Sequence, residues 1–99
     1  MSYVLFRLFA GILPGMRRRP VELSDAFALV VERLRKQKGL SRAALATRAG
    51  LHQTYLGLLE RGKRAPNLDT AQAVARSLRI PLSKLIAKAE RKQRRKPAP

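Results

Sequence analysis

The side chains of this sequence that could do chemistry are mostly basic, and the chemistry open to them is the binding of anions. The 99 residues include 22 Lys and Arg against 6 Asp and Glu, a formal net charge of +16. Residues 1–22 carry 4 basic and 1 acidic residue, residues 23–87 carry 12 and 4, and residues 88–99 carry 6 and 1. This excess predicts a polyanionic partner. Nucleic acid is favoured over a membrane surface or a merely solvated surface, because a solvated surface interleaves both signs more evenly.

Side chains suited to catalysis or metal binding are scarce. With no cysteine and one histidine, the chain offers neither a thiolate site nor a histidine cluster, and no nucleophile-base set can be assembled. No paired carboxylates share a face of an expected helix, and no glycine-rich phosphate loop follows a strand. We therefore expect a binding protein rather than an enzyme, with no catalytic residues, no metal and no cofactor.

The segment from Ser41 to Arg64 is the one that would present the basic and polar side chains. Its apolar residues recur at helical spacing on what would be the inner faces of two short helices, and Gly50 lies at the turn between them. Two such helices joined by a turn are the helix-turn-helix pattern. The inner-face residues are Leu45, Ala46, Ala49, Leu51, Leu56 and Leu59.

Three further helices must support these two. We expect helices over residues 25–38, 42–48 and 53–61, with Ser24 and Ser41 as N-caps of the first two and Gly62 ending the third. A fourth helix should follow the N-cap Asn67, and a fifth should follow Pro81. The fifth helix carries three apolar residues that could either complete the core or mediate self-association, namely Leu82, Leu85 and Ile86.

Two tails flank the expected domain at residues 23–87. Residues 1–15 are largely apolar, but a spanning helix needs about 20 apolar residues, and a secretory signal would place its charge before the apolar run. Residues 1–22 are therefore either a disordered or misassigned extension, with Met16 as an alternative start, or a real amphipathic segment. Residues 88–99 have charge without an apolar stripe. They could extend the fifth helix by a turn or two, but we expect them to bury nothing, to fray and to add sequence-independent attraction to phosphate.

An ordered set of short motifs extends from about residue 31 to 86: Leu34-Arg35, Gly39-Leu40-Ser41, Leu45-Ala46, Ala49-Gly50-Leu51, Leu59 to Arg64, Pro66, Ala75, Leu78 and Leu82 to Ile86. In these motifs the chain resembles the Cro/C1-type (XRE) helix-turn-helix domains of phage repressors, restriction-modification controller proteins and antitoxin-type regulators. The resemblance implies an all-α, lambda-repressor-like bundle of five helices with flexible N- and C-terminal tails.

The resemblance also assigns the reading of bases to the helix that begins at Gln53. Gln53 and Thr54 match the positions of direct readout, with Leu58 one turn further on. A glutamine amide can pair with adenine N6 and N7, and a threonine can offer its hydroxyl to a base or its methyl group to thymine. Tyr55 could join the readout, reach a phosphate through its hydroxyl, or cover the junction between the two short helices. Gly57 is expected on the outward face, where it either lets DNA approach closely or is a neutral surface position.

Phosphate contacts are implied for four residues and a scaffold role for two. Arg42 replaces the usual glutamine at the start of the first short helix, and arginine serves phosphate at least as well. Lys63 and Arg64 resemble backbone clamps, while His52 stands where Ser or Thr normally caps, so a phosphate contact is favoured over a weak cap. Glu60 resembles the glutamate that pairs with an arginine of the preceding long helix, here Arg35.

The implied function is a sequence-specific, DNA-binding transcriptional regulator of repressor or controller type, acting in the cytoplasm as a homodimer on double-stranded DNA. Two alternatives remain open. One is an antitoxin-like interaction module that binds a toxin-type partner protein and autoregulates, and the other is a membrane-associated regulator using residues 1–15.

Overall fold

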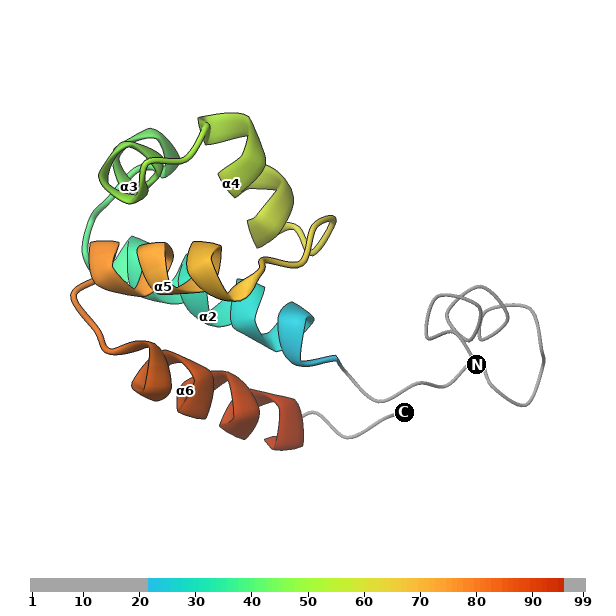
Figure 1. Ribbon diagram of the computed structural model, residues 1–99. Coiled ribbons are helices and arrows are strands. Elements are labelled where there is room, and N and C mark those ends of the chain that lie inside the picture. The colour runs from blue at the N-terminus through green and yellow to red at the C-terminus, as the bar shows by residue number, and fades with distance from the viewer. Residues whose placement is uncertain (1–21, 96–99) are drawn as a thin grey trace, which may run out of the picture.

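The computed structural model describes residues 22–95, and these form five α-helices with no strand among them (Figure 1). The expected helices within the domain are therefore confirmed, whereas the interpretations of residues 1–21 and 96–99 lie outside the described residues. None of the described helices is long and apolar enough to cross a membrane. In chain order the helices are α2 (Leu23–Gln37), α3 (Arg42–Ala49), α4 (Gln53–Glu60), α5 (Leu68–Ser77) and α6 (Leu82–Arg95).

The helices enclose one apolar core. α3 and α4 lie at one end of the bundle, α2 and α5 cross its middle, and α6 lies on the far side (Figure 1). Side chains from all five helices meet between these layers and are almost completely inaccessible to water. Truncating a leucine in such a position to alanine typically costs about 2–5 kcal/mol. The largest buried side chains are Leu45, Leu56, Leu59, Leu78, Leu85, Val30, Val31 and Val74.

α6 differs from the expected last helix in what its end buries. It continues to Arg95, so residues 88–95 extend the helix by about two turns, which the sequence allowed, but the expectation that they bury nothing is wrong. Ala89 is fully buried because it lies four residues after Leu85, on the same inward stripe of the helix. Leu82 and Ile86 pack against the core around Leu85, so the apolar residues of this helix complete the core.

The starts of α3 and α5 agree with the expected caps, and the start of α2 does not. Ser41 Oγ accepts a hydrogen bond from the amide of Ala44 at 3.0 Å, and Asn67 Oδ1 accepts one from the amide of Thr70 at 2.8 Å. α2 begins at Leu23, with Glu22 in the N-cap position, so Ser24 lies inside the first turn and the prediction that it caps is wrong. The carbonyl of Glu22 already accepts from the amides of the first turn, which extends the helix toward the N-terminus.

The ends of α2, α3, α4 and α5 share one geometry. Each helix is followed by a residue with positive φ, and the next residue donates its amide back to a carbonyl of the last turn. After α2, α3 and α4 that residue is glycine, which adopts this conformation without a steric penalty. After α5 it is Arg79, at a φ of 58°. A residue with a Cβ costs about 1–2 kcal/mol in the left-handed region, so the end of α5 is strained.

Candidate nucleic-acid interface

The turn between α3 and α4 sets the direction of α4. Gly50 adopts a φ of 70°, and Leu51 then packs against the core. The expectation that His52 caps poorly is wrong, because its Nδ1 accepts a hydrogen bond from the amide of Thr54 at 3.1 Å. A neutral histidine that accepts at Nδ1 carries its proton on Nε2. His52 therefore begins α4 and keeps its second ring nitrogen as a donor on an exposed side chain.

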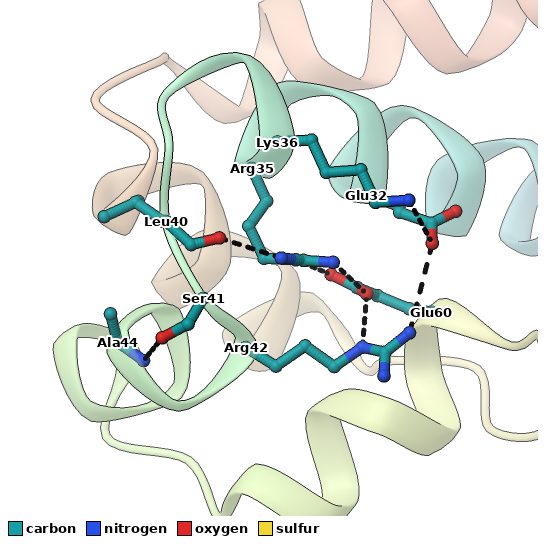
Figure 2. A network of polar contacts seen from close by, with 8 residues as sticks. All are labelled: Glu32, Arg35, Lys36, Leu40, Ser41, Arg42, Ala44 and Glu60. Atoms are coloured by element: carbon teal, nitrogen blue, oxygen red, sulfur yellow. Dashed lines mark hydrogen bonds and ion pairs between the residues drawn. The ribbon is translucent and has the colours of Figure 1, made fainter.

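Glu60 joins three helices through one buried carboxylate (Figure 2). Arg35 donates from Nε to Oε2 at 2.7 Å and from Nη2 to Oε1 at 3.2 Å. The Nη1 of Arg35 also donates to the carbonyl of Leu40 at 2.8 Å. The Glu60 side chain is 0% exposed and that of Arg35 is 8% exposed, so the pair expected from the sequence forms inside the bundle. It ties α4 to α2 at the end of each helix.

Arg42 is a third member of this network, and the sequence did not reveal that role. Its Nε donates to Glu60 Oε1 at 2.9 Å, and its Nη2 lies 4.0 Å from Glu32 Oε2 (Figure 2). The hydrogen bond that Arg42 donates to Glu60 and the negative charge of that carboxylate raise the pKa of Arg42. The side chain is still 39% exposed. A guanidinium has five donors, so Arg42 can be oriented by Glu60 and still bind a phosphate.

The residues expected to read bases differ in exposure. Gln53 and Thr54 are exposed at the start of α4, and within residues 22–95 their side chains have no protein partner. Leu58, one turn later, is half-buried. Tyr55 is half-buried against the core, which favours its role as a cover for the junction. It lines a shallow depression of about 510 Å³ with Leu51, Arg64, Ala65, Asn67 and Thr70.

The loop after α4 carries the two expected backbone clamps. Lys63 and Arg64 are both exposed, and neither forms an ion pair with a carboxylate of the described chain. The amide of Lys63 donates to the carbonyl of Leu58 at 2.8 Å, which fixes the start of the loop against the end of α4. The loop therefore presents the cationic side chains of Lys63 and Arg64, and the hydrogen bond of the Lys63 amide fixes the loop backbone where it leaves α4.

The sequence led us to expect Gly57 on the open surface, and the structure does not place it there. It is buried, and a Cβ built on it would lie 3.3 Å from Nη1 of Arg61. The long side chain of Arg61 folds back along the helix, as helical side chains do, and covers the glycine four residues earlier. Sequence reasoning assigned no role to Arg61, although the four-residue spacing was the signal that could have found it.

The arrangement suits the binding of hydrogen-bond acceptors. Amide, hydroxyl, guanidinium and ammonium donors are exposed on α4, on the start of α3 and in the loop after α4. In the described part of the chain, no three histidine or carboxylate side chains come together as a metal site. Such donors match the acceptors of base edges and phosphates.

Comparison with known proteins gives a consistent result. The helix-turn-helix family matches residues 31–85. An uncharacterized HTH-type transcriptional regulator, y4dJ of Sinorhizobium fredii, is 39% identical over 54 residues, which cover 54% of this chain and 70% of that protein. The control protein C.SmaI of Serratia marcescens is 32% identical over 68 residues, which cover 69% of this chain and 81% of that protein.

A solved structure extends the likeness to three dimensions. The restriction-modification controller protein C.AhdI of Aeromonas hydrophila is 35% identical and superposes with a TM-score of 0.60. The match covers 63% of this chain and 94% of C.AhdI. Nearly the whole of a controller protein therefore corresponds to the helical bundle described above.

Proposed function

This chain belongs to the Cro/C1-type helix-turn-helix family of DNA-binding transcriptional regulators, and from that premise we propose that it inserts α4 into the major groove of a specific operator. The observation that carries the proposal is the pair Gln53 and Thr54. Both are exposed at the start of α4, without a partner in the described protein, where a recognition helix meets base edges. Gln53 would pair with adenine and Thr54 with a neighbouring base.

Phosphate contacts would fix the register of α4 in the groove. Arg42, oriented by Glu60, would contact the backbone beside the start of α3, and the exposed Nε2 of His52 would contact it beside the start of α4. Lys63 and Arg64 would hold the backbone at the other end of α4. Contacts of this kind position a protein on the duplex but carry no sequence information.

We propose a homodimer as the binding species, acting in the cytoplasm. One short helix offers few readers, and a two-fold dimer doubles them over half-sites about 34 Å apart. Leu85 is fully buried in the core, whereas Leu82 and Ile86 are only partly buried against it, so the exposed parts of these two side chains are candidates for self-association. The relatives are regulators and control proteins, and they do not support the antitoxin alternative or its toxin-type partner.

Selection of bound sequences from a random duplex pool tests the proposal directly. The full chain should enrich a sequence with two-fold symmetry and half-sites about one helical turn apart. Gel shifts on the enriched duplex and on a scrambled duplex of equal length, repeated across a series of salt concentrations, measure the preference. Equal binding to both duplexes at every salt concentration would contradict a sequence-specific regulator.

A further inference from the structure

We propose that Arg61 reads a guanine in the major groove, next to the base read by Thr54, and that Gly57 is the residue that permits it. This inference rests on the proposed function and adds a reader to the same helix. It starts from the contact between the Arg61 guanidinium and the space above Gly57.

Helix geometry places Arg61 with the expected readers. Residues seven positions apart lie only about 20° apart around an α-helix, so Arg61 leaves α4 in nearly the same direction as Thr54. Leu56, Leu59 and Glu60 are buried and define the opposite face. Arg61 is the C-cap residue of α4, and its side chain is exposed. Its Cα therefore lies on the side of α4 away from the core, at the edge of a depression that Arg61 shares with Asp25 and Leu29 of α2.

Gly57 decides where the end of that side chain lies. A Cβ at this position would be 3.3 Å from Nη1 and 3.8 Å from Cζ of Arg61. Because glycine has no Cβ, the guanidinium can lie against the backbone of α4, one turn toward the N-terminus from its own Cα. This brings a cationic fork from the end of the helix toward its first turn, beside Gln53 and Thr54, where base edges are expected.

The guanidinium is free to bind. Within residues 22–95, Arg61 has no ion pair or hydrogen-bonded side-chain partner, in contrast to Arg35 and Arg42. Arginine in the major groove pairs with O6 and N7 of guanine through two parallel hydrogen bonds, the commonest specific contact between a protein and a base. A lysine cannot reproduce this planar pairing although it keeps the charge.

Binding constants of the full chain on its selected operator, and on each single-base variant of that operator, test the inference. The native chain should discriminate against loss of one G·C pair in each half-site by about 10- to 100-fold. Arg61→Ala should abolish the discrimination at that pair alone, and Arg61→Lys should lose most of it. Gly57→Ala should weaken the same discrimination without lowering the Tm, because alanine favours the helix and the flexible arginine can move aside.

The double substitution Gly57→Ala with Arg61→Ala is the matched control. It should show the same discrimination between bases as Arg61→Ala alone. Gly57 acts only through Arg61, so its substitution should add no further loss once Arg61 is gone. Arg61 would instead be a phosphate contact, and the inference wrong, if Arg61→Ala weakened binding to all duplexes equally and reduced the salt slope by about 1 unit. Unchanged binding by Arg61→Ala would also overturn it, leaving the proposed function intact. A native chain that selects no sequence would overturn both.

Discussion

The inner face of α4 and its first turn use polar side chains in different ways. On the inner face, Leu56 and Leu59 are fully buried, and Glu60 is held by two arginines of other helices. In the first turn, Gln53 and Thr54 are exposed and make no side-chain hydrogen bond within the described protein. The polar group of the inner face fixes the helix in the bundle, whereas the polar groups of the first turn are available to a partner.

This difference means that stability and recognition should separate by residue. A substitution on the inner face changes the position of the whole recognition helix, whereas one in the exposed first turn changes only what that helix can touch. Surface substitutions away from special contacts usually alter stability by about 0.5 kcal/mol or less. The four predictions below test whether the separation holds, from the largest expected effect to the smallest.

Replacing Glu60 by alanine should have the largest effect. Arg35 would keep a buried positive charge without its partner, and removing one member of a buried pair costs about 3–5 kcal/mol. For a domain of this size we expect the Tm to fall by more than about 10 °C, measured by thermal denaturation followed by circular dichroism. The exposed Glu90 of α6 is the control, because Glu90→Ala removes the same charge without a buried partner. Equal Tm values for Glu60→Ala and Glu90→Ala would contradict a stabilising role for the buried Glu60 carboxylate.

Replacing Gln53 by alanine should weaken recognition and leave the fold unchanged. Loss of one bidentate base contact costs about 1–3 kcal/mol, which is roughly a 5- to 150-fold increase in Kd on the selected operator. The Tm should stay within a few degrees of the native value, because the side chain has no partner in the described protein. Fluorescence anisotropy and thermal denaturation of the same preparation separate the two effects. A clear loss of Tm would show that Gln53 supports the scaffold.

Two basic regions should differ in their contribution to the salt dependence of binding. If Lys63 and Arg64 each neutralise one phosphate, substituting both by glutamine should reduce the slope of log K against log salt by about 2 units. The same change at Arg91 and Arg94, exposed residues of α6, should reduce it far less. α6 lies across α2 and α5 from α4 (Figure 1), away from a duplex bound by α4.

Gel shifts of the native chain and the two double variants at equal concentration across a salt series measure this difference. The paired substitutions remove the same number of charges, so the change in net charge is matched. Equal slopes in the two variants would show that the basic end of α6 reaches the DNA after all, as the sequence-based expectation for residues 88–99 has it.

Replacing Arg79 by glycine should have the smallest effect, and in the opposite direction. The residue has a φ of 58°, where glycine avoids the steric penalty of a Cβ but loses more entropy on folding. We expect a net stabilisation of about 0.5–1 kcal/mol with operator affinity unchanged. Thermal denaturation measures the change in stability, and fluorescence anisotropy measures the affinity for the operator. A lower Tm would mean that the Arg79 side chain stabilises the end of α5 by more than its backbone strain costs.

The sequence by itself was sufficient for the repetitive features of this protein. Helical spacing of apolar residues, Ser41 and Asn67 as caps, and glycines after three helices are local signals, since each depends on residues within one or two turns. The pair of Arg35 with Glu60 spans 25 residues and was available only through resemblance to a family, because no local pattern brings two such distant side chains together.

Tertiary structure decided which of several possible contacts each remaining side chain makes. Arg42 was expected at phosphate, and the packing of α3 against α4 also places it on Glu60. Ala89 was expected to lie in the basic tail, but α6 continues through it and packs along α2, and Ala89 is buried. Arg61 had no expected role until folding laid its guanidinium over Gly57. Such long or small side chains can satisfy several local patterns equally well, so only the neighbours that the fold supplies distinguish between them.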